Sequence, residues 1–236
     1  MNKLLSLSVT HSKRIFRDPF LLFITFLPLF VSLLFRILIP ELQQLLINHF
    51  DLRLYYPLIM VFLIMISPMF FGWVIGFSLL DDRDEDILAY MSVTPLQKSG
   101  YLGFKIIAPV LISVIQGYLV LVIADLCPMN YLKLLPVIIL MAIETPIFAL
   151  AQGVLASNKV EGLAVGKLLG IALIGPFASY FFDSPFAYLA GIFPPFWITE
   201  SYFNDGAHYW LSLAVGLLIH IIFLVGLTRI FNRKQG

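Results

Sequence analysis

Glu144 is the acidic residue of this chain most unusual in its setting, because it lies near the middle of an apolar stretch, in Ile143-Glu144-Thr145-Pro146. A carboxylate there is costly unless it is neutral, paired or facing water, and such residues are functional candidates by default. Glu144 and Thr145 are therefore candidates to line a pathway that favours cationic or zwitterionic substrates. The alternative is structural, with Glu144 satisfying a backbone group freed by the kink at Pro146.

A second group of acids, at residues 81–86 (Asp-Asp-Arg-Asp-Glu-Asp), leads the apolar run 87–91. Carboxylates suit a helix N-terminus because they oppose the positive end of its dipole. Residues 94–97 (Thr-Pro-Leu-Gln) predict the start of a second helix, with Thr94 as N-cap, proline at the first helical position and Gln97 reaching back as in a capping box. We expect a helix–turn–helix elbow shaped to dock into another protein. The residues predicted to make this contact are Asp84, Glu85, Asp86, Ile87, Leu88, Tyr90, Met91, Thr94, Pro95 and Leu96.

Other chemistries lack their residue patterns. No phosphate-binding loop occurs in the sequence, because the nearest stretch, Gly162 to Lys167, has its glycines one residue too close and Leu168 where a hydroxyl is required. The four histidines are far apart, without metal-ligand spacing. No basic patch of the kind that binds nucleic acid occurs, and the single cysteine, Cys127, excludes an internal disulfide. We expect no metal, no cofactor bound by this chain and no nucleic-acid partner.

Six long apolar stretches must position these residues. The chain of 236 residues is 60% hydrophobic and 12% charged, far from the composition of a soluble domain. About 20 apolar residues cross the hydrocarbon, and a helix satisfies its own backbone polar groups in lipid. We predict an all-α polytopic membrane protein with residues 20–230 as its transmembrane domain. Its six helices are predicted at about 20–39, 57–80, 106–124, 134–156, 167–183 and 209–230.

The placement of lysine and arginine predicts the orientation. Twelve of the fifteen basic residues fall on one side of the predicted spans, and only Arg36, Arg53 and Lys133 fall on the other. The side richer in Lys and Arg faces the cytoplasm. We therefore expect both termini to be cytoplasmic, in the plasma membrane of a bacterium, without a cleavable signal peptide. Residues 81–105 and 157–167 are expected to be cytoplasmic, and residues 40–56, 125–133 and 184–208 external.

Three further segments are predicted at the membrane surface. Residues 1–19 have a basic and an apolar helical face, which indicates a cytoplasmic interfacial connecting helix; the alternative is a disordered start that only sets topology. Residues 184–199 are uncharged but interrupted by three prolines and a glycine. Apolar, broken backbone at membrane depth must be buried or line a cavity, so we expect an external re-entrant hairpin, or else one long tilted span over 167–199. Residues 231–236 are expected to form a cytoplasmic tail.

Glycines recur every four residues in two of the predicted spans. Gly72 and Gly76 lie in the second, and Gly162, Gly166 and Gly170 lie at the start of the fifth. Such spacing permits close helix approach. We interpret both repeats as packing faces and not as a site.

The acidic cluster, its apolar run, Thr-Pro-Leu at 94–96 and Tyr-Leu-Gly-Phe-Lys at 101–105 together resemble the coupling segment of ABC exporter permeases of the type-two family. The basic start ending in Asp-Pro at 18–19 resembles that family's connecting helix, and residues 156–167 resemble the second cytoplasmic loop of its small drug-export permeases, some described as fluoroquinolone exporters. The resemblance covers nearly the whole chain. It implies ATP and Mg held by a separate cytosolic ATPase subunit, and a working unit of two permease chains, identical or related, with two ATPases.

These observations predict the permease subunit of an ATP-driven exporter, which moves an amphipathic or hydrophobic compound out of the cell by alternating access. The chain is not expected to be an enzyme. Two alternatives stay open. One is a membrane-embedded enzyme acting on lipid, with Glu144 and a histidine as acid and base; the other is a structural subunit of a membrane complex. Co-purification with a cytosolic ATPase would distinguish the exporter subunit from both alternatives.

Overall fold

The computed structural model describes residues 19–95 and 97–234, and within these ranges the chain forms helices and no strands. The predicted all-α fold is confirmed. The expected connecting helix over residues 1–19 lies almost entirely outside the described residues. The elements in order are α2 (Pro19–Leu46), η1 (Leu52–Tyr55), α3 (Tyr56–Asp84), α4 (Ile87–Ser92), α5 (Gln97–Ala124), α6 (Tyr131–Ala142), α7 (Glu144–Leu155), α8 (Lys159–Leu169), η2 (Gly170–Leu173), α9 (Ile174–Phe181), η3 (Pro185–Ile192), α10 (Pro194–Phe203) and α11 (Gly206–Lys234).

Six helical segments of the described chain are long and apolar enough to cross a membrane, one for each predicted span. They extend past the predicted bounds, since α2 continues to Leu46 and α11 to Lys234. Residues 231–234 of the expected tail are therefore helical. The fifth segment begins at Lys159, so most of the stretch 157–167, expected to be a loop, belongs to α8.

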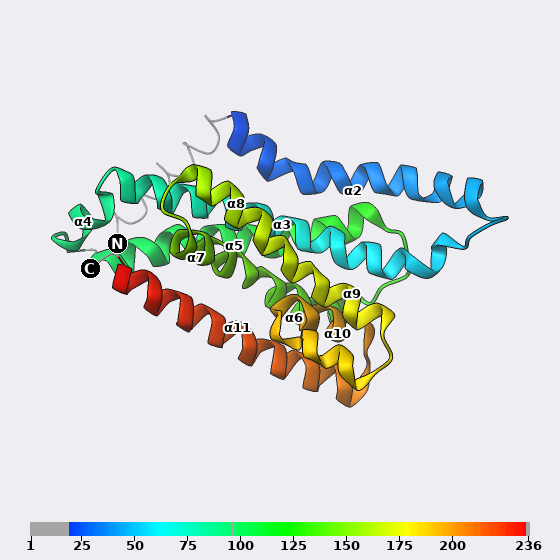
Figure 1. The fold of residues 1–236 in the computed structure, drawn as a ribbon. Coiled ribbons are helices and arrows are strands. Elements are labelled where there is room, and N and C mark those ends of the chain that lie inside the picture. Colours follow the sequence, from blue (N-terminus) through cyan, green and yellow to red (C-terminus); the bar gives the residue numbers. More distant parts are fainter. Residues whose placement is uncertain (1–18, 96, 235–236) are drawn as a thin grey trace.

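The long helices lie side by side along one direction, with α2 at one edge and α11 at the other (Figure 1). Helix α4 lies at one end of this bundle, which we call the α4 end, and α11 finishes at the same end. The short elements η3 and α10 lie toward the opposite end, which we call the α10 end. They occupy the stretch 184–199 predicted to be a broken hairpin.

Helix α3 is the centre of the bundle and packs against α2, α5, α7 and α8. Glycines allow these close crossings, because a Cβ on Gly72 would lie 2.5 Å from Cβ of Phe148, and one on Gly76 would lie 2.2 Å from Oε1 of Gln152. Gly162 and Gly166 likewise face side chains of α3. The packing interpretation holds for these four glycines and is wrong for Gly170, which has nothing within 4 Å of its added Cβ.

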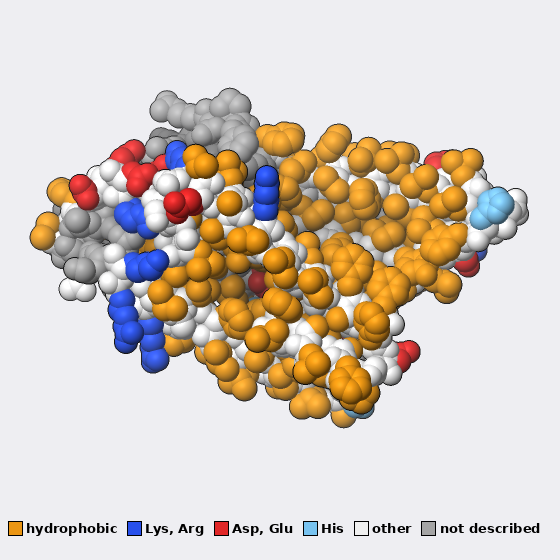
Figure 2. Space-filling model, viewed as in Figure 1, with side chains coloured by type: hydrophobic (Ala, Val, Ile, Leu, Met, Phe, Trp, Pro, Cys, Tyr) orange, Lys and Arg blue, Asp and Glu red, His pale blue; other side chains and the backbone are white. Residues whose placement is uncertain are grey.

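The surface of the bundle separates charge from apolar side chains (Figure 2). Basic and acidic side chains gather at the α4 end, while the long middle section presents mainly hydrophobic side chains. Large residues such as Phe30 and Ile107 are exposed there. An apolar belt of this extent fits a surface whose solvent is lipid.

The fourth membrane segment is broken at Ile143 into α6 and α7. Pro146 explains the break, because proline has no N–H to donate to the carbonyl of Ala142 and its ring clashes with that carbonyl. The N–H of Ile143 bonds to the carbonyl three residues earlier, that of Leu140, at 3.2 Å, in a tighter turn than that of an α-helix. Glu144 is consequently in the first turn of α7, next to a one-residue irregularity at which Ile143 keeps right-handed helical backbone angles.

Candidate functional site

The segment around α4 presents an exposed surface at the α4 end of the bundle. Asp86 and Gln97, on either side of α4, have positive φ angles of 54° and 57°, a backbone conformation that is uncommon outside glycine. Tyr90 is 68% exposed and Val93 82% exposed. We call the following exposed residues the α4 surface: Asp84, Glu85, Asp86, Tyr90, Val93 and Pro95.

The remaining predicted contact residues are placed differently. Ile87, Met91 and Thr94 are partly buried, and the side chains of Leu88 and Leu96 lie outside the described part of the chain. The predicted N-cap is wrong, since α5 begins at Gln97 and the hydroxyl of Thr94 donates to the carbonyl of Met91 at 2.8 Å.

Of the acids expected at the start of a helix, Asp86 directly precedes α4, but three others do not lie at a helix start. Asp81, Asp82 and Asp84 are in the last turn of α3, where the helix dipole is negative. Basic groups compensate this arrangement. Lys159 of α8 pairs with Asp81 at 2.7 Å, and a lysine of α5 pairs with Asp82.

Asp82 and Lys105 form a buried ion pair between α3 and α5, directly behind α4. Their side chains are 7% and 3% exposed. The carboxylate of Asp82 also accepts a hydrogen bond from the hydroxyl of Tyr101 at 2.9 Å, and the ammonium of Lys105 also donates to the carbonyl of Ser78 at 2.9 Å. The sequence offered one signal for this cluster, because Tyr101 and Lys105 are four residues apart on one helix face.

Two basic side chains tie the end of α7 to neighbouring helices. Arg83 of α3 donates to the carbonyl of Ala156 at 3.0 Å, and Lys234 of α11 donates to the carbonyl of Val154 at 2.8 Å. Carbonyls at a helix C-terminus lack intrahelical donors and attract cations. The helices α3, α5, α7 and α11 are thus cross-linked by charged groups at the α4 end.

The structure buries the two predicted pathway residues inside the single chain. Glu144 is 2% exposed and Thr145 is 0% exposed. The hydroxyl of Thr145 lies 3.0 Å from that of Ser113 on α5, and the Ser113 hydroxyl donates to the carbonyl of Pro109 at 2.9 Å. The carboxylate of Glu144 faces a residue that sequence reasoning did not single out, His220 of α11.

Glu144 and His220 form the second buried acid–base pair. Oε1 of Glu144 lies 3.3 Å from Nε2 of His220, whose ring is fully buried. The other ring nitrogen, Nδ1, lies 2.6 Å from the carbonyl oxygen of Gly216. The signal was available, because two ionisable residues inside different membrane segments are expected to pair with one another. In this conformation no substrate reaches the pair.

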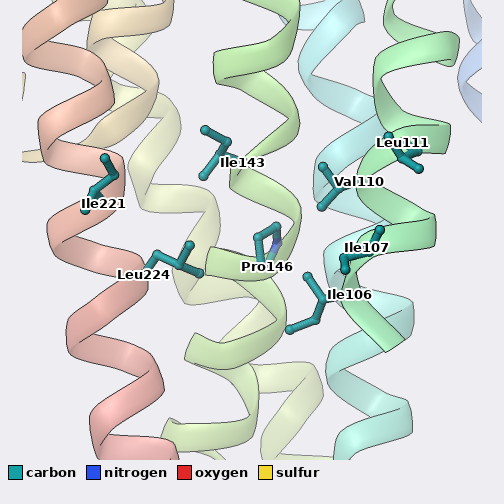
Figure 3. A pocket seen from close by; sticks show the side chains of 8 residues that line it. All are labelled: Ile106, Ile107, Val110, Leu111, Ile143, Pro146, Ile221 and Leu224. Atoms are coloured by element: carbon teal, nitrogen blue, oxygen red, sulfur yellow. The ribbon is translucent and has the colours of Figure 1, made fainter. Parts of the chain in front are cut away.

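An apolar pocket of about 280 Å³ is lined in part by residues close to this pair in the sequence. In Figure 3 its side chains come from α5 on one side, from α11 on the other and from the α6–α7 break between them. Ile143 and Pro146 flank Glu144 and Thr145, and Ile221 follows His220 in the sequence. The lining is suited to an apolar group and has no ligand for a metal. Elsewhere in the described ranges no cluster of three His, Cys, Asp or Glu side chains could hold a metal ion.

Comparisons with known proteins give a consistent result. A sequence model of the family described as "Fluoroquinolones export permease protein Rv2686c-like" matches residues 11–228. Two Mycobacterium tuberculosis proteins are each 27% identical over 228 residues, covering 94% of this chain and 90% of theirs. They are described as fluoroquinolones export permease protein Rv2686c, from strain H37Rv, and fluoroquinolones export permease protein MT2760, from strain CDC 1551. No solved structure gives a significant match.

Proposed function

Because this chain belongs to the Rv2686c-like family of fluoroquinolone export permeases, we propose that it is the membrane subunit of an ABC exporter for an amphipathic or hydrophobic compound. Family membership confirms the predicted resemblance to drug-export permeases. Together with six apolar helices it identifies a multi-pass membrane protein with a transport role. Since the sequence contains no phosphate-binding loop, a separate cytosolic subunit holds ATP and Mg and hydrolyses the nucleotide.

The observation that carries this proposal is the exposed α4 surface. Its acids lie directly before the short helix α4, its exposed Tyr90 lies in that helix, and its exposed Val93 lies directly after it. Non-glycine residues with positive φ, such as Asp86 and Gln97, concentrate at switch and binding sites. A surface that combines charge with a central aromatic side chain suits a protein partner. We infer that the α4 surface is the elbow that docks into a groove of the ATPase.

The charged cross-links behind α4 supply a mechanical route from the ATPase to the membrane helices. The Asp82–Lys105 pair joins α3 to α5, and Arg83 and Lys234 join α3 and α11 to the end of α7. A displacement of α4 therefore moves these helices as a group. Closure of two ATPases against two permease chains would tilt the helices and open the pathway outward, which is alternating access.

The proposed orientation places the α4 end in the cytoplasm. Basic side chains concentrate at this end (Figure 2), and the positive-inside rule assigns such an end to the cytoplasmic face. Both termini and α4 are then cytoplasmic. η3 and α10 form an external re-entrant hairpin.

Reconstitution with the ATPase tests the proposal. The chain is co-expressed with its ABC ATPase, purified in lipid nanodiscs, and assayed for ATP hydrolysis stimulated by a fluoroquinolone. Glu85→Lys should abolish the stimulation, because it reverses a charge on the α4 surface and leaves the core untouched. Glu41→Lys is the matched control, since Glu41 is also exposed but lies near the C-terminal end of α2 and not on the α4 surface. No associated ATPase, or full stimulation in Glu85→Lys, would contradict the proposal.

A further inference from the structure

We propose that Glu144 and His220 form a proton-binding site within the membrane domain, and that its protonation state controls the contact between α7 and α11. The inference does not depend on the ATPase or on the identity of the transported compound. It starts from the geometry of the pair. The two facing atoms, Oε1 of Glu144 and Nε2 of His220, are 3.3 Å apart, and neither has a hydrogen bond of good geometry to any other described group.

The hydrogen bond at the other ring nitrogen fixes where one histidine proton lies. A carbonyl oxygen can only accept a hydrogen bond, so Nδ1 of His220, 2.6 Å from the carbonyl of Gly216, carries a proton. In the neutral ring Nε2 is then an unprotonated acceptor that faces the carboxyl group. The contact needs one further proton, held either by Glu144 as a carboxylic acid or by Nε2 as part of an imidazolium.

Counting protons shows why the site responds to their number. With one shared proton the pair is neutral as a whole, because it is either two neutral groups or a carboxylate with an imidazolium. Loss of this proton leaves a carboxylate facing a lone pair, and gain of a second leaves an imidazolium facing a neutral acid. Each of these states places one uncompensated charge at a buried position, which is strongly unfavourable.

No other charged group of the described chain compensates such a change. On the helices packed against the pair, Asp82 lies roughly 15 Å along α3 from Gly72, which contacts Thr145, and Lys105 lies roughly 12 Å along α5 from Ser113, given the rise of an α-helix. Arg229 lies roughly 14 Å along α11 from His220 by the same measure.

The other titratable groups on these helices are engaged or exposed elsewhere. On α10 the carboxylate of Glu200 accepts hydrogen bonds from Ser179 and Asn204, and on α6 Lys133 pairs with Asp205 at 2.7 Å. On α8 Lys167 is exposed. Four tyrosine hydroxyls on these helices have partners. That of Tyr101 bonds to Asp82, and that of Tyr118 bonds to the carbonyl of Tyr131. That of Tyr202 bonds to Met129, and that of Tyr209 bonds to the carbonyl of Lys133. His208 is exposed at the start of α11, and Asp81, Arg83, Asp84, Lys159, Glu161, Arg233 and Lys234 lie at or near the α4 end.

The place of the pair in the fold gives its protonation a structural consequence. Glu144 is in the first turn of α7, immediately after the break at Ile143. His220 is one turn along α11 from Gly216, where an added Cβ would lie 2.8 Å from Trp197 and 2.9 Å from Leu140. A change of charge between α7 and α11 thus acts one helical turn from a tight crossing. Separation of the two helices would admit water or a cation to Glu144.

Infrared spectroscopy of the purified chain in nanodiscs tests this inference directly. Spectra are recorded from about pH 4 to about pH 9, which brackets the ordinary pKa values of Glu and His, for the wild type and for Glu144→Gln, His220→Gln and His208→Gln. A carboxyl band that is absent in Glu144→Gln should change with pH. Its midpoint should move by about one pH unit or more in His220→Gln, because coupled groups titrate as a pair, and should not move in His208→Gln.

Histidine labelled with nitrogen-15 gives a second readout that requires no variant at position 220. The signals of His220 are assigned by comparison with those of the remaining three histidines. Nδ1 of His220 should stay protonated, while the protonation of Nε2 should change together with the Glu144 band. The proposal is overturned if no Glu144-dependent band changes over the range in folded protein. It is equally overturned if the band titrates identically in His220→Gln and wild type. If His220→Gln does not fold, the nitrogen-15 measurement on the wild type decides, and an Nε2 of His220 that does not respond to pH overturns the proposal.

Discussion

Asp82–Lys105 at the α4 end and Glu144–His220 in the middle of the bundle are both buried acid–base pairs, but they differ in their hydrogen bonds. The first pair is in direct contact and is supported by Tyr101 and by the carbonyl of Ser78. In the second pair the facing atoms are 3.3 Å apart and have no other partner among the described residues. A pair with its hydrogen bonds satisfied holds one geometry, whereas a pair that depends on one proton can change.

The chemistry of the two bases reinforces this difference. Lysine is ordinarily charged, and Lys105 is in direct contact with the carboxylate of Asp82, so this pair links α3 to α5. A histidine exchanges its proton near neutral pH in ordinary surroundings. We therefore interpret the pair behind α4 as a brace that transmits movement, and the pair in the membrane domain as a group that senses protonation.

The largest expected effect separates the two pairs by stability. Asp82→Asn should lower the free energy of unfolding by about 3–5 kcal/mol, because it removes the buried carboxylate that compensates the charge of Lys105. Glu144→Gln should cost only about 1 kcal/mol, since neutral His220 can accept a hydrogen bond from the new amide. Unfolding in a mixed-detergent titration measures both. Equal losses would show that the pairs do not differ in the way described.

A smaller effect is expected from the packing that encloses the pair in the membrane domain. Gly72→Ala should cost about 1–3 kcal/mol, because the added Cβ would be forced against Phe148 and the carbonyl of Thr145, next to Glu144. Gly170→Ala is the control, with an expected change within about 0.5 kcal/mol. The same unfolding titration applies. If Gly72→Ala leaves the free energy of unfolding unchanged, α3 and α7 are loosely packed around Gly72.

The smallest effect concerns an ion pair that lies close to Asp82 in sequence but is open to solvent. Lys159 and Asp81 are 58% and 43% exposed at a separation of 2.7 Å. Lys159→Ala should therefore change the free energy of unfolding by no more than about 1 kcal/mol, because water and salt screen exposed pairs. A loss as large as that of Asp82→Asn would indicate that exposure does not explain the contrast.

The number and order of the membrane segments could be predicted from sequence because lipid imposes a minimum length of apolar helix on each crossing. The contacts of single polar residues could not. Lys105 was interpreted as a topological signal between two spans, yet α5 starts early enough to carry it into the core opposite Asp82. The pairing of Glu144 with His220 depends on the rotation of α7 and α11 about their axes, which a single sequence does not specify. Pro146 did signal an irregularity in the helix, which is confined to the single residue Ile143 between α6 and α7.

Cross-linking from two equally exposed positions tests the central claim, that the α4 surface contacts an ATPase. On a Cys127→Ala background, a single cysteine replaces Val93, which is 82% exposed next to α4, or Leu132, which is 84% exposed on α6 toward the α10 end. Each is coupled to a photoreactive cross-linker in membranes that contain the ABC ATPase. We predict an ATPase adduct from position 93 and none from position 132. Adducts from neither position, or equally from both, would contradict it.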